Sequence, residues 1–294
     1  MDTTIRPVVR AVYDLQKVRI SVGNRIAASF HARFGINPSE KVDPKDPEDQ
    51  KIFKKLKTEY KRITDGYIAN DKKITKQTFT PTDIFRNYAE FELVSNYFQL
   101  LGNEERFFNT LAKYVEATPL WNEFLVDVRG IGPAMTGVLL SEVSIEKCTY
   151  ASTLWKYAGL AVEADGQGQS RKEAHLVDRE YIAKDGSVKT RKSITFNPFL
   201  KTKLVGVLGP SFLKQPADKC KYRKLYDDYK HRLQQRPDWQ DKTDGHRHNA
   251  AVRYAVKMFL LDLWVVWRKL EGLPTPDPYH VAKLGLQAHP GPLD

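Results

Sequence analysis

The sequence predicts a mainly α-helical protein with one small β-hairpin. Apolar residues recur every three or four positions over most of the chain, which is the spacing of one buried helix face. Glycine and proline separate these segments, and only residues 174–196 change to alternation, around Asp185-Gly186. Hydrophobic residues make up 41% of the 294 residues, which is enough for a core that needs no disulfide bonds.

The first 117 residues are predicted to form a helical N-terminal region. Its first helix is amphipathic and should end near Phe34-Gly35, because Gly35 can adopt the left-handed cap and Pro38 cannot continue a helix. Acidic residues and prolines predict an exposed loop next, and Gly102 is expected to separate the last two helices. The expected helices cover 8–34, 51–68, 83–101 and 103–116, with the loop at 37–50.

The remainder is predicted to contain a helix-hairpin-helix segment at 118–160 and a C-terminal region at 161–294. Asp185-Gly186 suits a two-residue type I′ turn, so residues 174–196 are expected to form the β-hairpin. Asn197 is the expected cap of a helix that Pro198 opens and that runs through Leu213. Two further helices are expected at 222–232 and 250–271.

The charge of the chain favours a polyanionic partner. Forty-seven Lys and Arg against 36 Asp and Glu give a net charge of +11. Each phosphate that a Lys or Arg neutralises releases condensed counterions, so such a chain is drawn to nucleic acid. The charge narrows the class of partner without identifying it.

The cysteines and the apolar segments predict a cytoplasmic protein without a membrane partner. Cys148 and Cys220 are far apart and have no His at zinc spacing, so we expect a reducing compartment and no metal site. The first ten residues lack the apolar core of a signal peptide. The most apolar stretch, 256–267, is interrupted by Lys257 and Asp262 and is too short to cross a bilayer, so it reads as a buried helix.

The clearest motif is a helix-hairpin-helix at residues 128–143. Gly130 and Gly132 permit a turn that other residues cannot adopt and let a phosphate approach the backbone. Ile131 is expected to anchor the turn in the core, and the start of the following helix to offer N–H groups to the phosphate. The alternative is an ordinary packing joint between two helices. A phosphate contact of this kind would be blind to base sequence.

Two later blocks follow this hairpin in a specific order. Tyr157-Ala158-Gly159-Leu160 ends a helix and leads through a glycine-containing loop to Ser170, and Gly245–Arg253 is a basic loop that opens a long helix. In this order the blocks resemble the C-terminal domain of the DEDD-type insertion-sequence transposases, which are serine-using, RNA-guided DNA recombinases. The resemblance covers about residues 128–270.

The resemblance implies that a serine hydroxyl attacks a DNA phosphodiester and holds the strand covalently. Ser170 is the residue whose context fits this catalytic role. Because a serine hydroxyl is a poor nucleophile by itself, it needs a neighbour such as Arg171, Lys172 or His175 to remove its proton or stabilise charge. The alternative is that Ser170 is only a residue of a flexible loop.

The chain departs from this family in its N-terminal half, where no RNase H-like domain is recognisable. Asp14 lies in a segment of helical periodicity rather than on a strand, and the sequence therefore predicts no RNase H-like sheet. The other available carboxylates have no recognisable spacing, and surface or capping roles explain them more simply. These carboxylates are Glu90, Glu92, Asp127 and Glu142.

Several basic residues are expected to contact DNA. His246 and His248 flank Arg247, but a metal site needs further ligands, so phosphate contact or helix-start hydrogen bonding is favoured over a metal. Arg253 and Lys257 are one helical turn apart and can face the same groove. The tryptophans at 264 and 267 are expected in the core. The predicted DNA-binding residues are Gly130, Ile131, Gly132, Arg171, Lys172, Arg191, Lys192, His246, Arg247, His248, Arg253 and Lys257.

Three interpretations follow from the sequence. The first is a transposase-like DNA-binding protein with strand-transfer chemistry at Ser170. The second is a non-catalytic DNA- or RNA-binding subunit derived from a transposase, and the third is a metal-dependent nuclease that uses dispersed carboxylates. DNA is the expected partner, and the sequence leaves open a structured RNA, a homo-oligomer and any cofactor.

Overall fold

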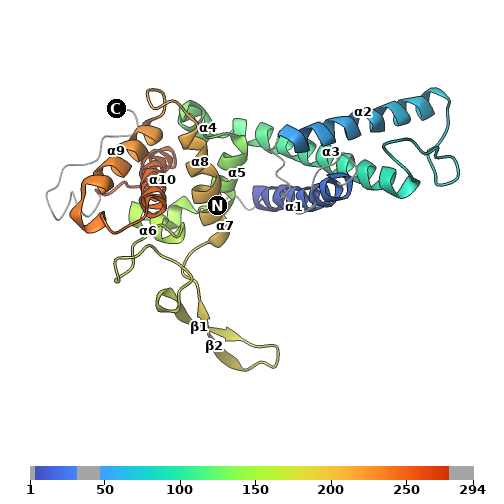
Figure 1. The fold of residues 1–294 in the computed structure, drawn as a ribbon. Coiled ribbons are helices and arrows are strands. Elements are labelled where there is room, and N and C mark those ends of the chain that lie inside the picture. The colour runs from blue at the N-terminus through green and yellow to red at the C-terminus, as the bar shows by residue number, and fades with distance from the viewer. Residues whose placement is uncertain (1–3, 32–46, 278–294) are drawn as a thin grey trace. The chain divides into compact units, whose positions relative to one another are not determined.

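The protein is mainly α-helical, as the sequence predicts, with a single two-stranded antiparallel sheet among the described residues (Figure 1). The computed structural model describes residues 4–31 and 47–277. The chain divides into two compact units. We call Arg10–Thr110 the N-terminal unit, and Met1–Val9 together with Leu111–Asp294 the C-terminal unit. The predicted segments 118–160 and 161–294 therefore both fall in the C-terminal unit.

In the described residues of the N-terminal unit there are three helices, of which α1 begins before the unit and α3 ends after it. They are α1 (Ile5–His31), α2 (Pro47–Ala69) and α3 (Tyr88–Glu116). Their apolar faces meet in an aromatic-rich core that includes Phe30, Leu56 and Phe91. The first two predicted helices are confirmed. The predicted end of the first, near Phe34-Gly35, lies outside the described residues, as does most of the loop expected at 37–50. From Pro47 onward that segment is helical, not loop.

Two predicted helices are in fact one. Helix α3 continues through Gly102, and residues 83–87 precede it as a non-helical connection. A glycine inside a helix costs only about 1 kcal/mol relative to alanine, which is too little to end a helix with buried residues on both sides of it. The start is marked instead by Asn87, whose side chain accepts from the Glu90 N–H at 3.0 Å, while Glu90 accepts from the Arg86 N–H. Glu90 therefore has the capping role that the sequence suggested.

The N-terminal region contains no strand among the described residues before Leu120, as predicted. Asp14 lies exposed on α1. None of the helices that the structure describes combines the length and the apolar character needed to cross a membrane.

The C-terminal unit is built around one long helix, α10, which contacts α4, α6, α8 and α9 (Figure 1). Trp264 and Trp267 are buried in its core, as expected, and the Trp264 indole donates to the Cys148 carbonyl at 2.7 Å. The helices of this unit are α4 (Pro119–Glu123), α5 (Pro133–Glu142), α6 (Ala151–Tyr157), α7 (Pro198–Lys203), α8 (Gly209–Leu213), α9 (Lys221–Gln235) and α10 (Asp244–Leu270), with 3-10 turns at Leu125–Asp127, Ile145–Lys147, Glu173–His175 and Pro237–Trp239.

Helix α10 begins earlier than its apolar pattern predicts. The segment from Gly245 to Asn249, expected as a basic loop, is helical. The Thr243 side chain accepts from the His246 N–H, and Asp244 places a negative charge in the first turn. Capping and the helix dipole therefore extend the helix beyond the last position that the core requires.

The helix predicted from Pro198 to Leu213 is confirmed in extent, but it has three parts. The Asn197 side chain caps it by accepting from the Leu200 N–H at 3.1 Å. A π-helical turn, Leu204–Leu208, joins α7 to α8. Such turns insert one residue into the helical ladder and re-aim the side chains that follow.

The β-hairpin is present as predicted, with β1 (Val177–Ile182) paired to β2 (Val188–Ser193). The prediction of a two-residue type I′ turn at Asp185-Gly186 is wrong. The Ala183 N–H donates to the Ser187 carbonyl, which leaves a three-residue loop between them. Gly186 alone in that loop has a positive φ, 80°. The Asp185 carboxylate instead accepts from the Ser187 hydroxyl at 2.6 Å, which stabilises the longer loop.

Candidate functional site

The glycine turn before α5 packs against the protein itself. Gly130 has a φ of 92°, and its carbonyl accepts from the Ser211 hydroxyl at 2.5 Å. A Cβ at Gly130 would meet the Phe212 ring and the Ser211 carbonyl. Glycine is therefore required here both for its backbone conformation and for the close approach of α8. This contact corresponds to the packing joint that the sequence left as an alternative.

The other glycine of the motif has different surroundings. Gly132 is extended, with a φ of −138°, and a Cβ there would meet nothing. Ile131 and Ala134 are half-buried, whereas α5 is buried on all sides from Met135 to Glu142. Any phosphate contact by this motif would therefore be made at Gly132 and the first turn of α5. That role stays a prediction.

The three blocks that carry the resemblance meet in the C-terminal unit. Gly159 ends α6 in the left-handed conformation, and its carbonyl accepts from the Arg253 guanidinium on α10 at 3.3 Å. The Trp155 indole donates to the Lys257 carbonyl at 3.1 Å. Asn197 joins the first two blocks, since its amide donates to Glu142 of α5 at 2.6 Å and to the Tyr157 hydroxyl at 3.0 Å.

A short hydrogen-bonded loop holds Ser170 in place. Val162 and Gly168 form an antiparallel bridge, and the Gln169 N–H donates to the Ala161 carbonyl. The fully buried Gln169 side chain donates to Thr195 at 2.5 Å, just after the β-hairpin. Ser170 thus follows Gln169, whose backbone and side chain are both hydrogen-bonded. Ser170 itself is half-buried.

Ser170, His175 and Asp165 form a hydrogen-bonded relay. The Ser170 Oγ lies 2.9 Å from His175 Nδ1, and His175 Nε2 lies 3.1 Å from an Asp165 carboxylate oxygen. The Ser170 backbone N–H also points at Nδ1, at 3.1 Å, which makes Nδ1 an acceptor and assigns the ring proton to Nε2. The single lone pair of Nδ1 is therefore shared between the Ser170 backbone N–H and the Ser170 hydroxyl.

The environment of the relay supports a base at His175. Its side chain is 2% exposed and is held in the 3-10 turn that precedes β1. The Gln167 backbone N–H, and then His175 itself, lower the pKa of Asp165, so the carboxylate stays ionised and orients the ring. The Lys172 N–H donates to the Ser170 Oγ at 3.2 Å. A serine, a histidine and an ionised carboxylate in this order can transfer the hydroxyl proton to the ring.

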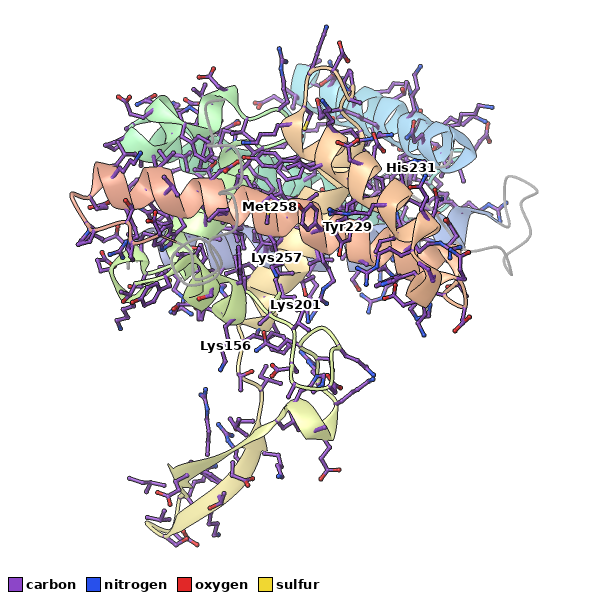
Figure 2. The ribbon with its side chains drawn as sticks, turned by 90° about the vertical axis from the view of Figure 1, so that its left-hand side faces the viewer. Lys156, Lys201, Tyr229, His231, Lys257 and Met258 are labelled. Atoms are coloured by element: carbon purple, nitrogen blue, oxygen red, sulfur yellow. The ribbon has the colours of Figure 1, made fainter. Side chains whose placement is uncertain are left out.

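Cationic side chains lie next to this relay. Lys201 donates to the Gln169 carbonyl at 2.5 Å, and the Arg253 guanidinium lies against Gly168. Burial, then the charges of Arg253 and Arg171, lower the pKa of Lys201 to about 8. Burial and then Arg253 also lower the pKa of Lys257, so the cations crowd one another. Figure 2 shows Lys201 and Lys257 on the same side of the C-terminal unit.

The remaining predicted residues do not join this cluster as one surface. His246 bonds to Thr243, Arg247 donates to the Trp239 and Lys242 carbonyls, and His248 bonds to Tyr226. The bonds of His246 and Arg247 lie at the start of α10, which is one of the two roles that the sequence favours over a metal site, and His248 bonds across to α9. Arg191 and Lys192 lie on β2 of the hairpin, and Arg171 and Lys172 are exposed beside Ser170.

Sequence reasoning named Ser170 and His175 but missed Asp165 and Lys201. Asp165 lies in a turn with Gly166, whose φ is 73°, and a turn aspartate ordinarily suggests only turn formation. Lys201 was one of many lysines. Within the described residues, no three His, Cys, Asp or Glu side chains form a group that could hold a metal ion.

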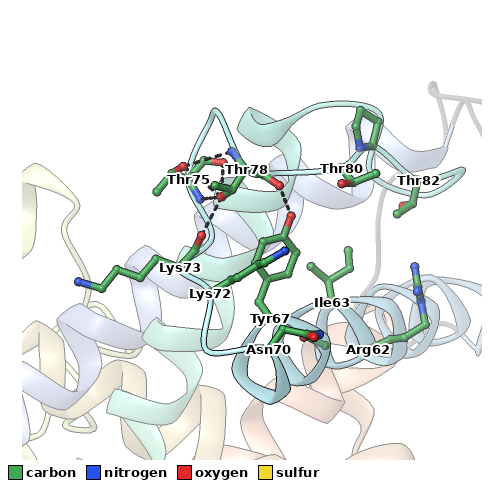
Figure 3. Close-up of a pocket in the computed structure, with 12 residues that line it drawn as sticks. Arg62, Ile63, Tyr67, Asn70, Lys72, Lys73, Thr75, Thr78, Thr80 and Thr82 are labelled. Atoms are coloured by element: carbon green, nitrogen blue, oxygen red, sulfur yellow. Dashed lines mark hydrogen bonds between the residues drawn. The ribbon is translucent and has the colours of Figure 1, made fainter.

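A hollow of about 800 Å³ lies in the N-terminal unit beside the end of α2 (Figure 3). The Thr78 hydroxyl donates to the Lys73 carbonyl at 2.7 Å, and the Tyr67 hydroxyl donates to the Thr78 carbonyl. Arg62 pairs with Glu59 at 2.7 Å. These bonds hold the shape of the adjoining loop, so we place the chemistry at Ser170 rather than here.

Comparison with known proteins gives no match: no family model, no curated protein and no solved structure is significantly similar to this chain.

Proposed function

We propose that this protein is a transposase-like DNA-binding enzyme in which Ser170 attacks a DNA phosphodiester. The observation that carries the proposal is the relay in which the Ser170 Oγ lies 2.9 Å from an acceptor nitrogen of His175. A serine at the position suggested by the resemblance is thus also the serine that has a base beside it. The spacing of Ser170 and His175 in the sequence does not by itself bring their side chains together, and the structure places them 2.9 Å apart.

The reaction follows from the groups in the relay. His175 Nδ1 takes the Ser170 proton as Oγ forms a bond to phosphorus, and the bond from phosphorus to a sugar oxygen breaks. His175 returns the proton to that sugar oxygen, which leaves as a hydroxyl. The strand is then joined to Ser170 as a phosphodiester, and a hydroxyl of another DNA end can reverse the step. Energy of the broken bond is retained in the new one, so no external co-reactant is needed.

The neighbouring cations support a phosphodiester as the substrate. Relays of serine, histidine and aspartate also serve acyl transfer on unrelated folds. Here burial, then the charges of Arg253 and Arg171, lower the pKa of Lys201, and such a cluster lowers its free energy by binding an anion. A phosphate group beside Ser170 meets this requirement, whereas an uncharged ester does not.

The activation of Ser170 can be tested without knowing the DNA target. A fluorophosphonate reagent reacts with an activated serine, since attack at phosphorus displaces fluoride and leaves a phosphonyl group on the oxygen. We expect covalent labelling of the full-length protein, located at Ser170 by mass spectrometry, and none in Ser170→Ala. Labelling that persists in Ser170→Ala, or a wild-type protein no more reactive than free serine, contradicts the proposal.

The same variant decides between the three interpretations. DNA cleavage that leaves a denaturant-resistant adduct in the wild type, and neither cleavage nor adduct in Ser170→Ala, supports strand transfer. Cleavage that requires magnesium and survives in Ser170→Ala indicates the metal-dependent nuclease. Equal DNA affinity of both proteins, together with an unreactive Ser170, indicates the non-catalytic binding subunit.

A further inference from the structure

The β-hairpin has two chemically different faces, although nearly all of its strand residues are exposed. In an antiparallel pair, residues directly opposite each other point to the same face, and successive pairs alternate between faces. The pairs Arg179↔Arg191 and Tyr181↔Lys189 therefore share one face. We call these four residues the basic face.

The carboxylates of the strands lie on the opposite face. Asp178 is paired with Lys192, at 3.4 Å between charged atoms, and Glu180 is opposite Thr190. The basic face has no strand carboxylate. Its Lys189 pairs at 3.2 Å with Asp185 of the loop, and the Arg191 guanidinium lies 5.1 Å from the centre of the Tyr181 ring. The carboxylates of both strands are thus confined to one face, away from the two arginines, although Lys192 shares that face with them.

This arrangement works against the stability of the isolated hairpin. Like charges directly opposite each other on a sheet are destabilising, and a two-stranded hairpin alone is only marginally stable in water. An arginine at position 190 would lie opposite Glu180 and gain an opposite charge, whereas Arg191 lies opposite Arg179. The observed order of residues therefore gives up a favourable charge pair within the hairpin. The repulsion between Arg179 and Arg191 is relieved when a polyanion lies along this face.

The dimensions select a DNA duplex as that polyanion. A two-stranded ribbon fits the major groove of B-DNA, which is about 12 Å wide, whereas the major groove of an A-form RNA helix is too narrow for it. Arg179 and Tyr181 are two residues apart, about 7 Å along the strand, and they point to the same face, so both side chains can enter one groove. The Arg191 guanidinium lies over the Tyr181 ring, so the arginine and the aromatic side chain enter the groove together.

Both ends of the hairpin are joined to the site at Ser170. His175, which bonds to Ser170, lies two residues before β1. Thr195, which bonds to Gln169, lies two residues after β2. A duplex held by the hairpin is thus connected to Ser170 through His175 and to the adjacent Gln169 through Thr195.

We infer that the basic face of the β-hairpin docks in the major groove of a DNA duplex and thereby holds it beside Ser170. The inference rests on the proposed function for its class of substrate. It adds a defined surface, Arg179, Tyr181, Lys189 and Arg191, and excludes the opposite face of the same hairpin.

The test compares two double variants of the full-length protein with equal loss of charge. Arg179→Ala with Arg191→Ala alters the basic face, and Lys184→Ala with Lys242→Ala removes the same charge from the hairpin loop and from an exposed lysine outside the hairpin. Affinity for a 30-base-pair DNA duplex is measured by fluorescence anisotropy over a salt series. We expect the basic-face variant to bind roughly tenfold more weakly and to lose about 1.8 from the slope of log affinity against log salt. The control should change much less.

Three outcomes overturn the inference. Equal effects of the two double variants would mean that only net charge matters, and no effect of either would remove the hairpin from the interface. An RNA duplex of the same sequence that responds equally to the basic-face variant would contradict docking in the DNA major groove. Fluorophosphonate labelling of Ser170, measured on the same proteins, separates these outcomes from failure of the proposed function, because labelling does not involve the hairpin.

Discussion

The turn at Gly130 and the loop at Ser170 differ in how their sequence signals relate to their surroundings. The turn has the stronger motif, yet its Gly130 carbonyl is bonded to Ser211 and its Cα faces Phe212. The loop has the weaker motif, yet it places Ser170 against His175 and beside Lys201. Glycines at this spacing indicate that another group approaches the backbone closely. A bound phosphate and a neighbouring helix both require the absence of a side chain, so the motif does not distinguish between them.

The largest expected effect concerns the base of the relay. His175→Ala removes the acceptor for the Ser170 proton, so the rate of fluorophosphonate labelling should fall by about 10²–10⁴-fold, the range of general-base catalysis. Lys172→Ala is the matched control, because it removes a neighbouring cation and keeps the backbone N–H that contacts Ser170. Equal labelling rates in His175→Ala and in the control would show that the geometry of the loop is not catalytic.

The next effect separates the two glycines of the turn. Gly130→Val introduces a side chain at a positive φ and against Phe212, so the free energy of unfolding should fall by about 2–4 kcal/mol in urea denaturation. Gly132→Val enters open space in extended backbone and should change it by about 0.5 kcal/mol or less.

The same pair of variants also tests whether the turn binds DNA. If the first turn of α5 contacts a phosphate, Gly132→Val should weaken DNA affinity while stability is kept. Unchanged affinity in a folded Gly132→Val protein would leave the turn as a packing joint only. DNA contact would then be confined to the side of Ser170.

A smaller effect is expected at the outer end of the relay. Asp165 is partly exposed and orients His175 rather than contacting Ser170. Asp165→Asn keeps the size of the side chain but loses the charge that favours the Nε2–H form, so labelling should slow by about tenfold. The bell-shaped or sigmoidal dependence of the labelling rate on pH should shift in this variant, which a purely structural role would not produce.

The smallest effect is a pH dependence of DNA binding between pH 7 and 9. Lys201 has a pKa of about 8, so it is cationic below this pH and loses its charge above it. The slope of log affinity against log salt should therefore decrease by about 0.9 as the pH rises. Lys201→Arg keeps its charge and should abolish the change. A slope that varies equally with pH in both proteins would exclude Lys201 from the DNA contact.

Titration of Lys201 does not destabilise the folded protein at high pH, so unfolding from this cause would not produce a weaker complex. The pKa of Lys201 is lower in the folded protein than its ordinary value of 10.5, so burial of the charge destabilises the folded state below about pH 8. This penalty diminishes as the pH rises through the folded pKa toward the ordinary value. The contribution of Lys201 to stability therefore improves over the range in which its contribution to binding is lost.

The sequence by itself determined the fold class, most of the helices and the β-hairpin, because these depend on local periodicity and on caps such as Asn197. It failed at Gly102 and at the start of α10, where packing outweighed a weak helix breaker and capping extended a helix beyond its apolar face. Both errors concern boundaries, where the competing free energies are about 1 kcal/mol.

The candidate site was only half visible in the sequence. Ser170 and His175 are five residues apart, so local reasoning could pair them. Asp165 joins them only because the bridge between Val162 and Gly168 folds the loop back, and Lys201 only because α7 lies against Gln169. Tertiary structure alone decided which of the many cations and carboxylates lie within hydrogen-bonding distance, because that distance depends on contacts between segments far apart in the chain.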